Sequence, residues 1–138
     1  MRADSDSANN IQGLHLMLAE DNELNAEIAQ TLLIDAGAVV TVVNNGQQAV
    51  ELFKDNQPGT FGAILMDVMM PVMDGLTATR TIRALDRDDA KTIPIIAMTA
   101  NAFAEDARKC IDAGMNAHVA KPIDMSKLTK TLKNCLSR

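Results

Sequence analysis

Four apolar runs of strand length in this chain each end in charged or reactive side chains. In chain order, the runs end in Glu20 with Asp21, in Asp67, in Thr99 and in Lys121. If the runs are parallel neighbours in one sheet, their carboxyl ends lie along the same edge of that sheet. The sequence therefore predicts that three carboxylates, a hydroxyl and an ammonium group gather at one place.

Three carboxylates held close together raise one another's pKa values unless a cation lies between them. Mg²⁺, held by a few carboxylates and several waters, fits the predicted ligands Glu20, Asp21 and Asp67, and Mn²⁺ is the alternative ion. Taken alone, Glu20 and Asp21 are also explained as acids that open a helix, because the helix dipole favours negative charge there. The presence of Asp67 at a neighbouring strand end favours the metal site over this simpler interpretation.

The other two side chains are suited to binding phosphoryl oxygens. Lys121 carries a compact positive charge, and Thr99 carries a hydroxyl group. Asp67 is a carboxylate nucleophile that needs no general base, and aspartyl phosphates are established covalent intermediates. The chain shows no activated Ser, Cys or His nucleophile. The set predicts phosphoryl transfer to Asp67, with positioning and charge neutralisation supplying most of the catalysis.

The elements that would position these side chains alternate between strands and helices. The patterns of apolar residues, caps and breakers predict strands near 14–19, 38–43, 61–66, 93–98 and 116–120, and helices near 22–37, 47–56, 76–85, 103–114 and 125–136. The first helix repeats Leu24, Ile28, Leu32 and Leu33 on one face, and the charged segment 86–91 is expected to be exposed.

This (βα)₅ pattern predicts an α/β fold with a parallel sheet covered by helices on both faces, because each parallel crossover needs a helix. Right-handed crossovers favour a doubly wound, flavodoxin-like sheet of five strands in the order 2-1-3-4-5. Sites in such sheets form where the strand order reverses, between strands one and three. Glu20, Asp21 and Asp67 would lie at that reversal.

Length and composition limit the other possibilities. A chain of 138 residues, 47% of them hydrophobic, fits one domain, which we assign to 13–138. The polar segment 1–12 lacks periodicity and is interpreted as a flexible linker or a cloning remnant. It also lacks the apolar core of a secretory signal, and no apolar run nears the roughly 20 residues of a membrane span, so we expect a cytoplasmic domain without membrane contact. The net charge of −5 and the absence of Trp and Tyr argue against direct nucleic-acid binding.

Four stretches of the sequence resemble the receiver domains of two-component signalling. They are LAEDNELN at 18–25, MDVMMPVMDG at 66–75, PIIAMTA at 94–100 and KP at 121–122. The resemblance covers about 13–136 and includes all five motif positions in order. It implies that Asp67 accepts a phosphoryl group from a phosphohistidine, borne by a histidine kinase or a histidine phosphotransfer domain.

The resemblance also implies roles for the residues around the acceptor. Mg²⁺ would be held by Glu20, Asp21, Asp67 and the backbone carbonyl of Met69, and the phosphoryl oxygens would be bound by Thr99 and Lys121. Receivers usually carry Tyr or Phe three residues before the lysine as a rotamer switch, whereas this chain has His118. Thr99 and His118 would form the switch; a half-exposed strand histidine without a signalling role stays an open alternative.

The run GLHLMLAEDNELN at 13–25, preceded by a polar segment, resembles receivers that follow a histidine kinase core, and we expect no DNA-binding output after the last helix. The chain therefore looks most like the receiver of a hybrid sensor histidine kinase. A stand-alone regulator is the alternative. We expect a monomer or weak dimer that catalyses its own phosphorylation and dephosphorylation within a phosphorelay, rather than a turnover enzyme alone.

Two other classes of protein remain open from the sequence. A hydrolase of the haloacid dehalogenase type would need a second Asp two residues after the nucleophile, where this chain has Met69. An interaction module that has kept the fold without the chemistry would have no need for the complete acidic pair, acceptor, hydroxyl and lysine. Sustained turnover of phosphate esters would indicate the hydrolase.

Overall fold

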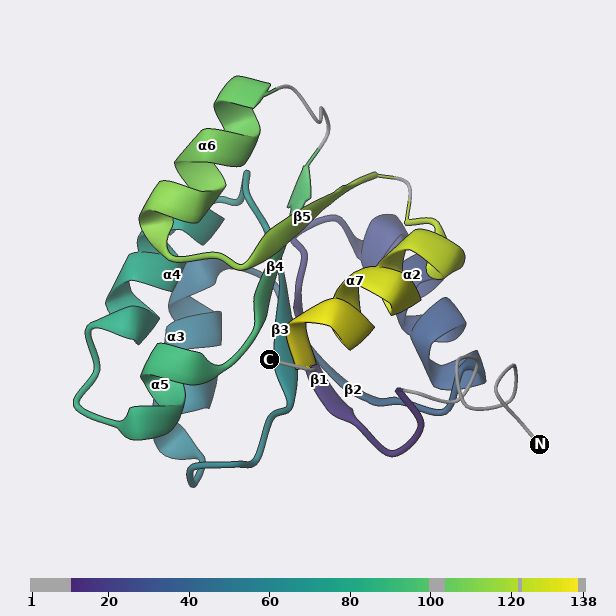
Figure 1. The fold of residues 1–138 in the computed structure, drawn as a ribbon, viewed down its shortest axis with the longest axis horizontal. Helices are drawn as coiled ribbons and strands as arrows, with labels where there is room; N and C mark the ends of the chain where they lie inside the picture. The colour runs from purple at the N-terminus through teal and green to yellow at the C-terminus, as the bar shows by residue number, and fades with distance from the viewer. Residues whose placement is uncertain (1–10, 100–103, 122, 137–138) are drawn as a thin grey trace.

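The five apolar runs form five parallel strands in the computed structural model of the chain, which describes residues 11–99, 104–121 and 123–136 (Figure 1). The strands are β1 His15–Ala19, β2 Val39–Val43, β3 Ala63–Asp67, β4 Ile95–Thr99 and β5 Ala117–Ala120. They lie in the order β2-β1-β3-β4-β5, which confirms the predicted doubly wound sheet. Pro122, the last residue of the receiver-like motifs, lies outside the described residues.

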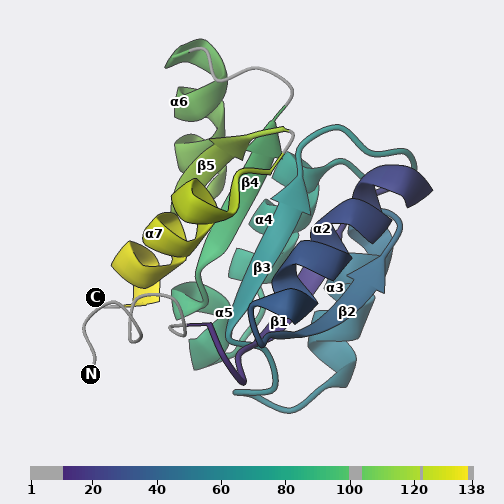
Figure 2. The same cartoon turned by 90° about the vertical axis from the view of Figure 1, so that its right-hand side faces the viewer.

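Helices cover both faces of the sheet. They are α2 Glu23–Asp35, α3 Gly46–Asp55, α4 Gly75–Arg83, α5 Asp88–Thr92, α6 Ala104–Ala113 and α7 Met125–Leu136. Figures 1 and 2 show α2 and α7 on one face and α3, α4, α5 and α6 on the other. The longest of them has 13 residues, and among the described residues no helix has the length and apolar character to cross a membrane.

Three of the helices begin at capped positions immediately beyond a strand or a short loop. The side chains of Asn22, Asn45 and Asp74 each accept a hydrogen bond from the backbone N–H three residues further on, at distances of 3.0, 2.8 and 2.7 Å. Such caps satisfy N–H groups that have no partner within the helix. The connections before α2 and α3 are therefore short, whereas the longer loop 68–74 precedes α4.

The hydrophobic core consists of two layers separated by the sheet. One layer packs beneath α3, α4 and α6 and includes Phe53, Ile64 and Ile82. The other packs beneath α2 and α7 and includes Leu33 and Leu128. All residues of β3 and β4 are buried, which is why these strands appear in the sequence as continuous apolar runs rather than as alternating patterns.

The first helix packs through a different stripe from the one its leucine and isoleucine repeat indicates. Leu24 and Ile28 are 64% and 49% exposed, whereas Ala26, Ala29 and Leu33 are buried. The small alanine side chains allow α2 to approach the sheet closely, and this turns the larger apolar residues toward solvent. The periodicity correctly predicted the helix, but of the residues in the predicted stripe only Leu33 is fully buried.

Two segments are more structured than the sequence indicated. The charged segment 86–91 contains the short helix α5, and Ala90 within it is completely buried. Ile11, which we assigned to the linker, is also completely buried and packs in the core layer beneath α2 and α7. The packed unit therefore extends to Ile11 rather than starting at residue 13, while residues 1–10 of the predicted linker lie outside the described residues.

Asn116 joins the start of β5 to two other elements. Its Oδ1 accepts hydrogen bonds from the backbone N–H of Ile95, at 2.9 Å, and from Nη2 of Arg83, at 2.8 Å. The Nε of Arg83 also donates to the Gly114 carbonyl, at 2.9 Å. A single side chain thus holds β4, β5 and α4 in register.

We expect Asn116→Ala to lower the free energy of unfolding by about 1–3 kcal/mol, because it leaves the buried N–H of Ile95 without its partner. Urea denaturation followed by circular dichroism measures this loss. Asn134→Ala, an exposed position on α7, is the matched control and should stay within about 0.5 kcal/mol of the wild type. Equal stability of the two variants would contradict the structural role of Asn116.

Candidate functional site

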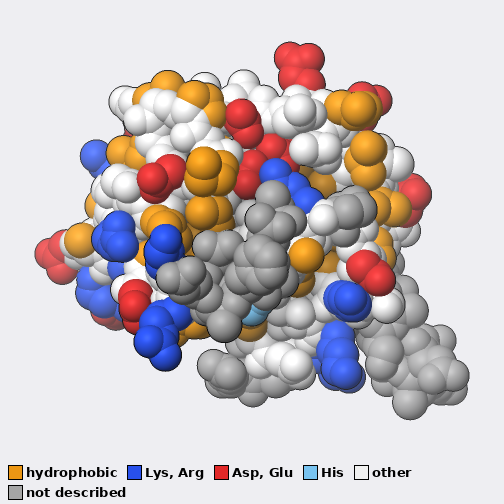
Figure 3. All heavy atoms as spheres, turned by 90° about the horizontal axis from the view of Figure 1, so that it is seen from above, with side chains coloured by type: hydrophobic (Ala, Val, Ile, Leu, Met, Phe, Trp, Pro, Cys, Tyr) orange, Lys and Arg blue, Asp and Glu red, His pale blue; other side chains and the backbone are white. Residues whose placement is uncertain are grey.

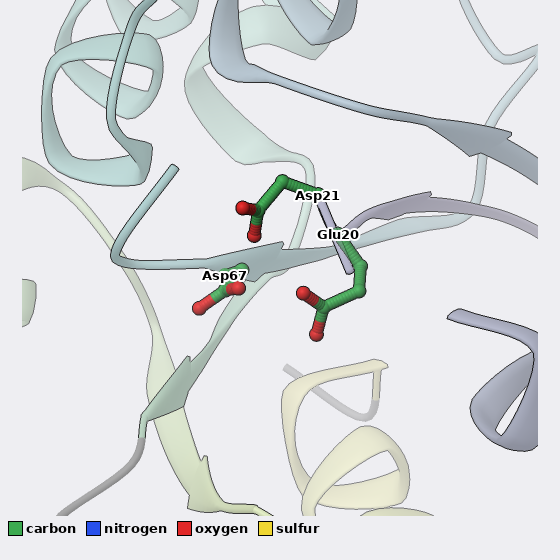
Figure 4. Close-up of side chains that lie close together, drawn as sticks. All are labelled: Glu20, Asp21 and Asp67. Atoms are coloured by element: carbon green, nitrogen blue, oxygen red, sulfur yellow. The ribbon is translucent and has the colours of Figure 1, made fainter. Parts of the chain in front are cut away.

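The three carboxylates lie together at the carboxyl edge of the sheet (Figure 4). Asp67 is the last residue of β3, and Glu20 and Asp21 directly follow β1. Ala19 and Met66 are paired across β1 and β3, so the residues that follow them lie side by side. One oxygen from each carboxylate lies within 4.8 Å of an oxygen of each of the others. The predicted gathering of these acids is what the structure shows.

Lys121 directly follows β5, the strand at one edge of the sheet, and its side chain reaches this cluster. Its Nζ donates hydrogen bonds to Oδ2 of Asp67, at 2.9 Å, and to Oε1 of Glu20, at 3.1 Å. Asp67 and Glu20 are each only 3% exposed, while Asp21 is open to solvent. The ammonium group of Lys121 therefore contacts two carboxylates that are shielded from water, and the exposed Asp21 completes the group of three carboxylates.

Burial and neighbouring charges shift the ionisation of two of these groups. Burial raises the pKa of Glu20 above its ordinary value of 4.5, and the Asp67 carboxylate raises it further, against the opposing effects of the Asn22 amide and Lys121. Burial by itself lowers the pKa of Lys121, but its hydrogen bonds to Asp67 and Glu20 outweigh this, so the pKa lies above the usual 10.5. The Lys121 ammonium is therefore charged at neutral pH. Ionising the Glu20 carboxyl group in the folded protein costs more free energy than it does in water.

The cluster has the charge and donor types that suit a hard divalent cation. Three carboxylates and one ammonium leave two negative charges uncompensated when all are ionised. Carboxylate oxygens are the ligands that Mg²⁺ and Mn²⁺ prefer. Seen from the carboxyl edge, acidic side chains gather near the middle of the face with basic side chains beside them, and hydrophobic side chains flank them on both sides (Figure 3).

Thr99 ends β4 next to the acceptor strand, where Asp67 pairs with Met98. The side chain is 5% exposed, and its hydroxyl has no hydrogen-bond partner among the described residues. A buried hydroxyl without a partner costs free energy, so such a group commonly awaits a ligand or a conformational change. The hydroxyl lies in the region where the sequence placed it.

The other two predicted site residues, Met69 and His118, lie outside the cluster of three carboxylates. Met69, in the loop after β3, is 77% exposed, and its backbone N–H points to Oδ1 of Asp67 at 3.4 Å. His118 pairs with Ala97 across β4 and β5 and lines a groove of about 470 Å³ between α6 and α7. Ala97, the partner of His118, lies two residues before Thr99 in β4, and side chains two apart point to the same face of a strand. His118 and Thr99 therefore lie on the same face of the sheet.

Sequence reasoning did not identify the glycines that support the acceptor. The residue types of Asp74 and Gly75 are typical of a turn, yet a Cβ atom at Gly75 would overlap with the backbone carbonyl of Asp67. Its N–H donates to the Val68 carbonyl at 2.9 Å and closes the loop after β3. The Asp-Gly pair signals a turn, but nothing in that signal indicates that the glycine packs directly against the acceptor.

Comparison with known proteins agrees with this fold and site. The model of the response regulator receiver domain family matches residues 16–133. Hybrid signal transduction histidine kinase M of Dictyostelium discoideum is 40% identical over 119 residues, which cover 86% of this chain and 5% of that protein. The chain spans between 5% and 15% of the length of the first curated kinases that it matches.

Solved receiver structures superimpose on nearly the whole chain. The receiver domain of sensor histidine kinase PA1611 from Pseudomonas aeruginosa PAO1, solved with a magnesium ion coordinated in its active-site cleft, is 40% identical with a TM-score of 0.80, covering 91% of this chain and 99% of that one. A chain from the co-crystal structure of the Saccharomyces cerevisiae phosphotransfer protein Ypd1 with the receiver domain of Ssk1 is 25% identical with a TM-score of 0.79, covering 92% and 91%.

The fold, the acidic edge and the matched family define a signalling receiver of the flavodoxin-like class. The chain belongs to the response regulator receiver domain family. The first curated relatives that it matches are histidine kinases, several of them named as hybrid kinases. Membership in this family removes the hydrolase of the haloacid dehalogenase type from the candidate classes.

The raised pKa of Glu20 predicts how the metal-free protein responds to pH. The folded state keeps the Glu20 proton at pH values where the unfolded chain, with a pKa near 4.5, has lost it. The free energy of unfolding therefore falls as pH rises from about 4.5 through the folded-state pKa. We expect Glu20→Gln to remove this decline and to be more stable than the wild type by about 1 kcal/mol at pH 7 without metal.

Urea denaturation in EDTA across this pH range measures the effect. Glu27→Gln, which changes an exposed carboxylate on α2, is the matched control and should follow the wild-type curve. A Glu20→Gln curve parallel to the wild type at all pH values would contradict the proposed cost of ionising Glu20.

Proposed function

We propose that this domain accepts a phosphoryl group from a phosphohistidine onto the carboxylate of Asp67 in a Mg²⁺-dependent reaction. The observation that carries the proposal is the position of Asp67, buried at the end of β3 with the Lys121 ammonium at 2.9 Å and two further carboxylates within reach of one cation. The Mg²⁺ in the cleft of the Pseudomonas receiver, which is 40% identical, supports the choice of ion.

In the proposed reaction, an oxygen of Asp67 attacks the phosphorus and the bond from phosphorus to the imidazole nitrogen breaks. The imidazole leaves with the electron pair of that bond and takes up a proton from solvent, and the acyl phosphate remains on Asp67. Glu20, Asp21, Asp67 and the Met69 carbonyl would hold the divalent ion, which supplies neutralisation of the charge on the phosphoryl oxygens. Lys121 already contacts Asp67 and would transfer one of its hydrogen bonds to a phosphoryl oxygen.

Phosphorylation would change the structure through the hydroxyl of Thr99. This buried hydroxyl has no partner among the described residues, and a phosphoryl oxygen on Asp67 offers it a charged acceptor. A shift of Thr99 toward Asp67 would leave space on its face of the sheet, and His118 on the same face is placed to move into it. The coupling typical of such two-state shifts is about 1–3 kcal/mol.

We propose a histidine kinase or a histidine phosphotransfer domain as the phosphodonor. The support comes from the hybrid kinases among the relatives and from the Ypd1 complex, in which a receiver is bound to a phosphotransfer protein. In this proposal the chain is the receiver part of a hybrid sensor kinase, acts as a monomer or weak dimer, binds no nucleic acid and works in the cytoplasm.

We expect Asp67→Asn to lose phosphorylation completely, because the amide removes the nucleophilic oxygen that forms the acyl phosphate. Incubation with radiolabelled acetyl phosphate and Mg²⁺, followed by mass measurement of the intact protein, reports the modification directly. Asp55→Asn, which changes an exposed carboxylate at the end of α3, is the control and should be labelled like the wild type. Labelled Asp67→Asn protein would show that the acceptor is a different residue.

Beryllofluoride, a mimic of the phosphoryl group, tests the roles of the metal and of Thr99 without turnover. With Mg²⁺ present and the mimic at about 100 times its dissociation constant, the free energy of unfolding should rise by about 2.7 kcal/mol. We expect Thr99→Ala to bind the mimic more weakly and gain less, because it lacks the hydroxyl donor. A wild-type protein whose thermal unfolding is unchanged by Mg²⁺ and beryllofluoride together would be an interaction module without receiver chemistry.

A further inference from the structure

The loop that follows Asp67 is attached to the rest of the domain at both ends. At its start, the Val68 N–H donates to the Met98 carbonyl at 3.2 Å, and the Val68 carbonyl accepts from Gly75 at 2.9 Å. At its far end, the Met73 carbonyl accepts from the N–H of Gly46 at 2.9 Å. This last contact connects the acceptor loop to α3, a helix that contributes no side chain to the acidic cluster.

Gly46 makes this contact because it has no side chain. A Cβ atom at Gly46 would overlap with the Met73 carbonyl oxygen and would lie 2.9 Å from the Asp74 carbonyl oxygen and 3.0 Å from the Ala78 Cβ. Two of these three neighbours are backbone atoms of the acceptor loop, which cannot yield by a change of rotamer. Any larger residue at position 46 therefore requires the loop to move away from α3.

The loop is held in a conformation that it would not adopt without constraint. Val72 has φ 67°, and the Met73 N–H donates to the Pro71 carbonyl at 2.7 Å, which closes a γ-turn around Val72. A β-branched residue with positive φ is a costly conformation that persists only where surrounding contacts enforce it. The Gly46 contact is made by Met73, the residue next to Val72, and so acts directly on this turn.

We infer that Gly46 is a positioning residue for the metal and phosphoryl site. By holding Met73, it keeps the strained turn closed and thereby sets the position of the preceding part of the loop, which includes Met69. This inference rests on the proposed function, in which the Met69 carbonyl and Asp67 are ligands of the divalent ion. Gly46 itself touches none of the reacting groups and acts only through the loop.

Gly46→Ala tests this inference, with Gly62→Ala as the matched control. A Cβ atom at Gly62 would overlap with Cδ1 of Leu14, the mobile end of a side chain, at the opposite end of β3 from Asp67. Isothermal titration calorimetry of the 138-residue chain with MgCl₂ measures the ion affinity, and urea denaturation reports the stability of each variant in EDTA.

We expect Gly46→Ala to weaken Mg²⁺ binding about tenfold, as groups that orient metal ligands typically do when changed, and Gly62→Ala to bind within twofold of the wild type. A folded Gly46→Ala variant that binds Mg²⁺ as tightly as the wild type would overturn the inference, whatever its loss of stability. A wild-type protein that bound no Mg²⁺ would instead contradict the proposed Mg²⁺-dependent function, on which this inference rests.

Hydrogen exchange of the wild-type protein gives a second test that needs no variant. The N–H of Gly46 is the first of α3 and has no partner within the helix, so its exchange reports on the contact with Met73. Coupling is reciprocal, so saturating Mg²⁺ should slow exchange at Gly46 at least threefold. The N–H of Gly62, which donates to the His15 carbonyl at 2.8 Å, should not change. Equal rates at Gly46 with and without Mg²⁺ would contradict the inference.

Discussion

The unbalanced negative charge at the carboxyl edge of the sheet is the constraint on which the rest of this structure depends. Glu20 and Asp67 are almost completely buried, Asp21 lies beside them, and Lys121 is the cation that contacts the first two. Folding alone would favour fewer carboxylates at this position. The arrangement is understandable if the domain is built to bind a divalent ion and to receive a charged group, so that the repulsion is relieved only when the site is occupied.

The fold meets this constraint by gathering the charges at one edge of the sheet. The reversal of strand order between β1 and β3 places the two acidic strand ends side by side, and the capped start of α2 keeps the loop after β1 short. The two apolar layers that hold the sheet lie behind these ends. The unfavourable free energy of holding these carboxylates together is thus confined to one edge of the sheet, while the apolar core stabilises the fold.

The hydroxyl of Thr99 and the turn at Val72 are two further places in the structure that are locally unfavourable. One is a buried donor without a partner among the described residues, and the other is a β-branched residue held at positive φ. Both belong to loops or strand ends that border Asp67. Strain of this kind is concentrated at functional sites and is maintained by contacts from elsewhere in the fold. In this domain those contacts come from α3 and from the backbone of β4.

The sequence by itself determined the five strands, every described helix except α5, the strand order and the set of residues at the acidic edge. Continuous apolar runs that end in Glu20, Asp67 and Thr99 can be recognised locally, and the rules of parallel crossovers bring their ends together whatever the details of packing. The receiver motifs agreed with this result. Departures such as His118 in place of an aromatic residue were also visible, because they require only a comparison of residue types.

The tertiary structure alone decided which faces are buried and what supports the site. The exposure of Leu24 and Ile28, the burial of Ile11 and the short helix α5 follow from how elements distant in the chain pack, and local periodicity carries no information on this. The supporting contacts of Gly46 and Gly75 were hidden for the same reason. A glycine in the sequence signals freedom of the backbone, whereas its value here is the space that it leaves for a loop from another part of the chain.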